Sequence, residues 1–176
     1  MNSKLISPRF LTLAGMILVA AIIRLLPHWP NFTPIGAMAL FGGAYFSKKY
    51  LAFIVPFLAM FLTDLILGFH ATMWSVYLSF GLIVVIGILM INKVKILNIF
   101  LASVAASVLF FVVTNFAMWT VGGIYSSDLN GLLECYTAAI PFFSYTLIGN
   151  LFFAGIMFGV FEIAKSKIPA LAEVKA

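Results

Sequence analysis

Six long apolar stretches, separated only by short polar connections, constrain the fold of this chain more than any other feature of its sequence. A helix needs about 20 mostly apolar residues to cross the hydrocarbon core of a bilayer, and fewer where neighbouring helices bury it. The predicted helices cover about residues 10–26, 34–46, 51–69, 73–91, 96–121 and 138–164. Only 9% of the residues are charged, whereas a soluble domain has about a quarter. We therefore expect an all-α membrane protein, a compact bundle of six transmembrane helices that forms a single domain over residues 1–176.

The basic residues predict the orientation of this bundle. Nine of the ten lysines and arginines lie before the first apolar stretch, after the last one, or in alternate connections. They are Lys4, Arg9, Lys48, Lys49, Lys93, Lys95, Lys165, Lys167 and Lys175. Because lysine and arginine are enriched in cytoplasmic loops, both termini are expected in the cytoplasm. The predicted location is the cell inner (cytoplasmic) membrane, which the chain crosses several times.

The first apolar stretch has an alternative interpretation as a cleavable signal peptide. Lys4 and Arg9 precede it, and Val19-Ala20-Ala21 has the small residues of a cleavage site. Its apolar character continues through Ile22 and Ile23, which favours a retained helix. Cleavage would leave the orientation of the other five helices unchanged, so the charge pattern does not decide between the two.

Asp64 is the one acidic residue predicted inside the hydrocarbon region away from a cytoplasmic end. A carboxylate there costs several kcal/mol unless it is paired or hydrated, which makes such a residue a functional candidate. Arg24 is predicted at a similar depth near the outer end of the first helix and is the expected partner. Two interpretations stay open: an ion pair that locks the first and third helices together, or a direct contact with a substrate.

The tryptophans and histidines point to a binding site on the outer side. An aromatic belt at the membrane interface explains several of the aromatic residues, but a belt is expected on both faces and no tryptophan lies on the cytoplasmic side. A planar or apolar ligand stacking among these rings is the alternative. The predicted substrate-binding residues are Asp64, His70, Trp74, Asn115, Trp119 and Tyr125, with His28, Trp29 and Asn31 closing the site.

The longest predicted outer connection runs from roughly Gly122 to Thr137. A loop of this length on a small bundle is a usual place for a lid or a binding surface, and a simply solvated loop is the alternative. Within the last helix, Asn150 is expected to hydrogen-bond to another helix, and Gly155 and Gly159 form a GxxxG pair that permits close packing.

The sequence lacks the motifs that are typical of ATPases and of several enzyme classes. No GxxxxGK[ST] phosphate loop is present, so any ATP hydrolysis belongs to a partner chain. No Gly-x-Ser-x-Gly or HExxH motif is present either, and we expect neither an enzyme nor a bound cofactor. His28, His70 and Cys135 could form an outward-facing metal site, although their spacing is not diagnostic. A structural subunit that joins a larger membrane complex through its small-residue helix faces is a further alternative.

The sequence resembles a bacterial family of uncharacterised transport proteins related to the S components of energy-coupling factor (ECF) transporters. The residues that carry the resemblance are Arg24, the runs 27–37, 41–44 and 64–70, Thr114-Asn115-Phe116, and the segment 131–143. An S component is the substrate-binding membrane subunit, so the resemblance implies capture of a vitamin-like or other micronutrient at the outer face. It also implies import with a transmembrane coupling protein and two ATPase subunits as partners. No role in nucleic-acid binding is expected.

Overall fold

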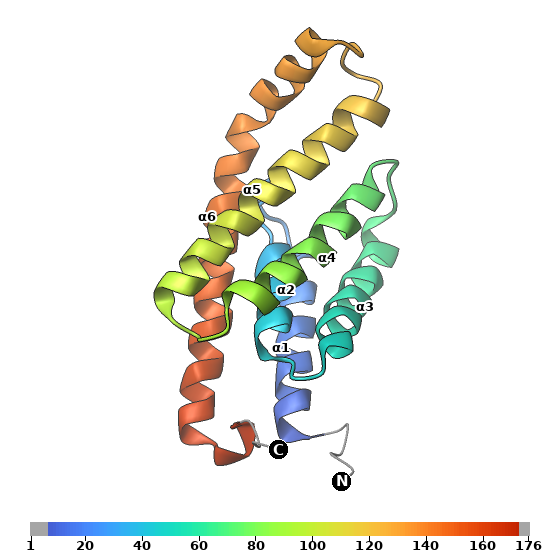
Figure 1. The fold of residues 1–176 in the computed structure, drawn as a ribbon. Coiled ribbons are helices and arrows are strands. Elements are labelled where there is room, and N and C mark those ends of the chain that lie inside the picture. The colour runs from blue at the N-terminus through green and yellow to red at the C-terminus, as the bar shows by residue number, and fades with distance from the viewer. Residues whose placement is uncertain (1–6, 173–176) are drawn as a thin grey trace.

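The computed structural model describes residues 7–172, which form six α-helices and a short 3₁₀-helix (Figure 1). The helices are α1 (Pro8–Ile23), α2 (Ile35–Tyr45), α3 (Lys49–Leu67), α4 (Met73–Met90), α5 (Ile96–Val121) and α6 (Leu129–Lys167), followed by η1 (Pro169–Leu171). The six predicted helices are therefore present. Lys4 and Lys175, two of the basic residues that predicted the orientation, lie outside the described residues.

Four of these helices, α3 to α6, are long and apolar enough to cross a membrane. The other two are shorter: α1 has 16 residues and α2 has 11. At 1.5 Å per residue α2 is only about 16 Å long, about half of the hydrocarbon thickness. An incomplete crossing is tolerated where the ends of the helix are buried in protein, because the unpaired backbone groups then avoid lipid.

The short helix α2 lies at the centre of the bundle, where it packs against all five other α-helices. Ten of its eleven residues are buried. Two glycines let α2 and α4 approach until backbone meets backbone. A Cβ atom on Gly87 would lie 2.6 Å from the carbonyl oxygen of Leu40, and one on Gly43 would collide with the carbonyl oxygen of Val84. This contact fixes α4 directly against the central helix.

The bundle has two ends that differ in charge. The start of α1, the end of α6 with η1, the α2–α3 connection and the α4–α5 connection lie at one end of the bundle, which we call the termini end (Figure 1). The connections α1–α2, α3–α4 and α5–α6 lie at the opposite or distal end (Figure 1). Within residues 7–172, Arg24 is the only lysine or arginine at the distal end.

At the termini end an aromatic cluster and a charged network join the first, second and last helices. Phe41, Tyr45, Phe158 and Phe161 pack together, with the rings of Tyr45 and Phe161 4.5 Å apart. The Tyr45 hydroxyl donates to the Glu162 carboxylate (2.6 Å), which also pairs with a lysine one turn further along α6. Arg9 donates to the backbone oxygens of Tyr45 and Leu171. These contacts tie α1, α2 and α6 together at this end.

The prediction for the last helix was wrong at its start. Helix α6 begins at Leu129 rather than near Ala138, so the connection after α5 spans only residues 122–128 instead of reaching Thr137. The reason is a cap: the Asp128 carboxylate accepts a hydrogen bond from the Gly131 amide (2.9 Å) and supplies the acceptor that starts a helix. With 39 residues α6 is about 58 Å long, and the α5–α6 hairpin extends beyond the other distal connections (Figure 1).

Candidate functional site

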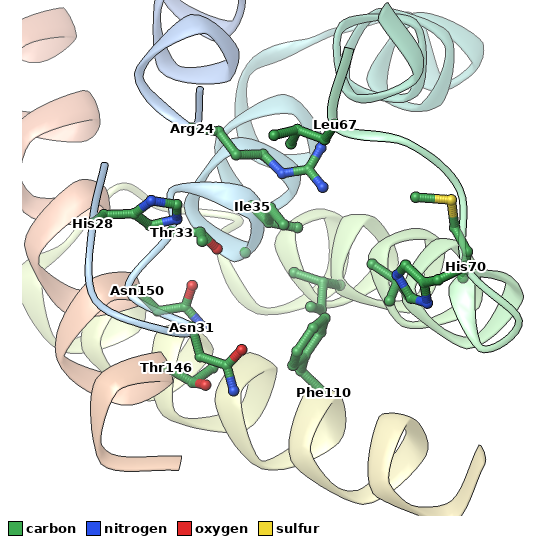
Figure 2. Close-up of a pocket in the computed structure, with 14 residues that line it drawn as sticks. Arg24, His28, Asn31, Thr33, Ile35, Leu67, His70, Phe110, Thr146 and Asn150 are labelled. Carbon is green, nitrogen blue, oxygen red and sulfur yellow. The ribbon is translucent and has the colours of Figure 1, made fainter. Parts of the chain in front are cut away.

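A cavity of about 260 Å³ lies at the distal end of the bundle. Helices α2 to α6 and the α1–α2 and α3–α4 connections contribute to it, as the close-up shows (Figure 2). The lining residues are Arg24, His28, Asn31, Thr33, Ile35, Gly36, Leu67, His70, Met73, Val76, Ile83, Phe110, Thr146 and Asn150. Half of these residues are polar or charged and half are not, so the recess offers a small molecule both apolar surface and hydrogen-bonding groups.

The lengths of the helices explain why a recess forms there. Helices α1 and α2 are the shortest, so the connection between them, residues 24–34, lies deeper in the bundle than the tip of the α5–α6 hairpin (Figure 1). The longer helices form the walls around it. A second cavity of about 210 Å³ adjoins the first and shares Asn31, Val76, Phe110 and Thr146 with it. The second cavity continues along α5 and α6 past Phe111, Asn115 and Phe142.

Arg24 is the only charged residue among those lining the two cavities. It follows the last residue of α1, and its Nη1 atom pairs with the Asp64 carboxylate (2.5 Å) and donates to the Thr63 hydroxyl (2.9 Å). The Tyr77 hydroxyl donates to the other carboxylate oxygen of Asp64 (2.7 Å). Asp64 is completely buried and contributes to neither lining, while the Arg24 guanidinium extends into the first cavity (Figure 2).

The first turn of α2 also faces this cavity, through Ile35 and Gly36. No side chain caps the helix, and the amides of these two residues make no hydrogen bond within residues 7–172. Asn31, in the connection just before, has a φ of 63°, a left-handed conformation that asparagine tolerates better than most residues. That turn carries the Asn31 side chain to the boundary between the two cavities.

Asn150 forms the deep wall of the first cavity on α6. Its Nδ2 atom donates to the Ser107 hydroxyl of α5 (2.9 Å), which confirms the prediction that it bonds to another helix. A Cβ atom on Gly36 would collide with the Asn150 carboxamide, so the missing side chain at residue 36 is what lets α6 approach α2 here. Thr146, one turn earlier, donates its hydroxyl to the Phe142 carbonyl.

The two histidines lie on opposite sides of the cavity, His28 in the α1–α2 connection and His70 in the α3–α4 connection (Figure 2). The Nδ1 atom of His28 lies 2.8 Å from the Leu26 carbonyl oxygen, and that of His70 lies 3.1 Å from the Thr72 hydroxyl. In both rings Nε2 has no partner among the described residues. Each imidazole ring therefore has one nitrogen that is free to form a hydrogen bond with a ligand.

The structure brings together some of the predicted site residues and separates others. His28, Asn31 and His70 line the first cavity, and Asn115 lines the second, as does Asn31. Asp64 lies behind Arg24, without access to either cavity.

The predicted aromatic residues line neither cavity. Trp29 and Trp74 are 65% and 51% exposed, and Trp119 donates its indole N–H to the Ser126 carbonyl oxygen beside the α5–α6 connection that contains Tyr125. Several lining residues were not predicted, among them Thr33, Phe110 and Thr146. Phe110 and Thr146 lie in mostly apolar sequence surroundings, and only the packing of α2, α5 and α6 shows that these residues share a cavity.

The structure does not bring together the ligands that the alternative prediction, an outward-facing metal site, requires. In the part of the chain that the structure describes, no three His, Cys, Asp or Glu side chains come together in a group that could hold a metal ion. Cys135 is buried between α5 and α6, where its Sγ atom lies 3.5 Å from the Asn115 carbonyl oxygen.

Comparison with known proteins gives one match. Residues 4–171 match a family described as a family of unknown function (DUF6580). No curated protein matches the chain. No solved structure matches it either.

Proposed function

From the premise that this chain belongs to the family of unknown function DUF6580, we propose that it is the substrate-binding subunit of a membrane transporter. In this proposal it resembles an ECF S component, captures a small vitamin-like micronutrient at its distal end, and passes it inward with a coupling protein driven by two ATPases. It carries out no chemical step itself. Both termini face the cytoplasm, in the inner membrane of the cell.

The observation that carries this proposal is the cavity at the distal end. It is recessed between helices that are long and apolar enough to lie in a membrane, and its polar side chains come from α6 and from the α1–α2 and α3–α4 connections. At the opposite end, the aromatic cluster around Tyr45 and the Arg9 and Glu162 contacts hold the helices together.

The charge distribution supports the proposed orientation. The described basic residues other than Arg24 lie at the termini end, which is the pattern of a cytoplasmic face. The distal end, with the cavity, then faces outward. The size of the cavity favours a small molecule: about 260 Å³ is below the ~300–1,000 Å³ typical of sites for drug-sized ligands.

Native mass spectrometry of the gently purified protein tests the proposal. We expect a small molecule to co-purify with the wild type and to be lost in Thr146→Phe, which fills the boundary of the two cavities. Thr137→Phe is the matched control: it lies on the same helix, is exposed, and like Thr146 donates its hydroxyl to the carbonyl four residues earlier. Absence of any bound molecule in the wild type, or equal occupancy in the two variants, would contradict the proposal.

A further inference from the structure

We infer that the distal cavity selects a small organic monocarboxylate, with its carboxylate against Arg24 and the amides of the first turn of α2, and its apolar body along Phe110. This inference rests on the proposed substrate-binding role and adds the chemical class of the substrate. It follows from the hydrogen-bonding capacity of the lining, the charges near it, and its two-part shape.

The free donors of Arg24 are the first reason. Only Nη1 is engaged, by Asp64 and Thr63, while Nη2 and Nε make no hydrogen bond within residues 7–172. Arginine has five N–H donors and no acceptor, so the part of it that faces the cavity must be met by an acceptor on the ligand. Its side chain is only 12% exposed. At such a site a planar carboxylate fits the guanidinium better than water or a single carbonyl, because it accepts two parallel hydrogen bonds.

The uncapped first turn of α2 is the second, independent reason. The amides of Ile35 and Gly36 lack partners among the described residues, and both residues line the same cavity as Arg24. The N-terminus of a helix carries a partial positive charge and free N–H donors, both of which favour an anion. Short helices that begin inside a transporter and point their N-termini at an anionic substrate group are a recurrent arrangement.

The remaining charges exclude the opposite class of ligand. No aspartate or glutamate lines either cavity, so an amine or a metal cation would face Arg24 without a compensating carboxylate. Asp64, the acid that pairs with Arg24, is completely buried. One of its carboxylate oxygens contacts Arg24, and the other accepts a hydrogen bond from the Tyr77 hydroxyl. It neutralises Arg24 from behind, which favours a singly charged ligand over a doubly charged one such as phosphate.

The apolar lining specifies the rest of the ligand. Beyond the polar groups the first cavity is bounded by side chains such as Leu67, Ile83 and Phe110, and Phe110 continues into the second cavity beside Phe111 and Phe142. A carboxylate with an apolar or aromatic body of roughly six to nine carbons matches this shape. The two adjoining volumes of about 260 and 210 Å³ accommodate it.

The test measures binding of matched probes to the full-length protein in lipid nanodiscs, with empty nanodiscs as the blank for partitioning. The probes are hexanoate and 3-phenylpropionate, each compared with its neutral amide and with hexylamine or 3-phenylpropylamine. We expect at least one carboxylate to bind about tenfold more tightly than its amide, equivalent to ~1.4 kcal/mol, and the amines not to bind. Failure of both carboxylates to bind, or an amide or amine that binds as tightly, would overturn the inference.

Two variants and one control test whether Arg24 causes the preference for carboxylates. They also distinguish a failure of this inference from a failure of the proposed function. Arg24→Gln with Asp64→Asn removes both charges and keeps side chains of similar size, and we expect the preference for carboxylate over amide to disappear. Thr146→Phe should abolish binding of every probe, while Thr137→Phe should not. If the amide binds as tightly as the carboxylate in the wild type and Thr146→Phe still abolishes binding, the cavity is a binding site but its anion selectivity is refuted. If Thr146→Phe changes nothing, the proposed function fails as well.

Discussion

The guanidinium of Arg24, just after α1, lies 2.5 Å from the carboxylate of Asp64 in the last turns of α3, and the two charges form an ion pair behind the distal cavity. Tyr77 of α4 donates to the same carboxylate, so the pair joins three helices. Arg24 thus has two roles at once: one nitrogen holds the bundle together, and the others face the cavity.

A double-mutant cycle should show a stabilising interaction energy between Arg24 and Asp64. Asp64→Asn leaves the mostly buried Arg24 charge without its partner, and removing one member of a buried pair costs about 3–5 kcal/mol. Arg24→Gln combined with Asp64→Asn should recover most of that loss, because no uncompensated charge remains. Thermal unfolding of the purified variants in one detergent measures both. A double variant no more stable than Asp64→Asn would show that the pair does not act as a unit.

The close approach of α2 and α4 depends on glycine. Gly87→Ala places a Cβ atom 2.6 Å from the Leu40 backbone oxygen, and neither helix can yield without moving its backbone. We expect a loss of about 1–3 kcal/mol, as for other overpacked positions, and a lower unfolding temperature.

Gly155→Ala and Gly159→Ala are the controls for this substitution, because nothing lies within 4 Å of a Cβ atom at either position. Both should be neutral or stabilising by up to about 1 kcal/mol, since alanine favours a helix more than glycine does. The GxxxG pair that the sequence shows is therefore not used for packing within the described chain. A marked loss of stability in either control would instead indicate a contact with another molecule in the membrane.

The hydroxyl of Tyr45 should stabilise the packing of α2 against α6 at the termini end. Tyr45→Phe keeps the ring in its aromatic cluster but removes the 2.6 Å hydrogen bond to Glu162, and a bond to a charged group contributes about 1.5–3 kcal/mol. Tyr136→Phe is the matched control, since its hydroxyl donates to the neutral Val112 carbonyl at a less enclosed position. We expect a clearly larger drop in unfolding temperature for Tyr45→Phe, and equal drops would refute this role.

The start of α6 should depend on pH through its cap. The hydrogen bond from the Ser126 hydroxyl, followed by that from the Gly131 amide, holds the pKa of Asp128 below its ordinary value. A lowered pKa means that the cap is fully present at neutral pH and is lost only as the pH falls through that lowered value. Amide hydrogen exchange over residues 129–132 should therefore accelerate only in strong acid, or at neutral pH in Asp128→Ala. Asp128→Asn, which can still cap, should remain protected at all pH values.

Much of the bundle is predictable from apolar length alone. The bounds of α5, 96–121, coincide with the prediction, and the other helices up to α4 differ by at most three residues at either end. The start of α6 was missed because the segment 129–137 mixes Leu132, Leu133 and Tyr136 with polar residues, and the Asp128 cap decides its conformation. A carboxylate three residues before a glycine amide is a local signal, but it is a weak one without the geometry.

The site was predictable only in part, for a physical reason. Histidine and asparagine stand out in an apolar chain, and His28, Asn31, His70 and Asn115 do line the cavities. Tryptophans stand out as well, yet Trp29 and Trp74 project outward, because interfaces and binding sites both favour aromatic rings and the sequence does not separate the two.

That the chain is all-helical and apolar enough for a membrane follows from its residues alone, because the length of an apolar stretch and the placement of charges are local properties. That α2 is a short, buried central helix whose first turn lines the same cavity as Arg24 follows only from the packed fold. That arrangement depends on contacts such as Gly36 against Asn150 and Gly87 against Leu40, between residues far apart in the chain. Close packing of this kind depends on the shapes of two facing surfaces, and the sequence of one helix does not show which other helix it will pack against.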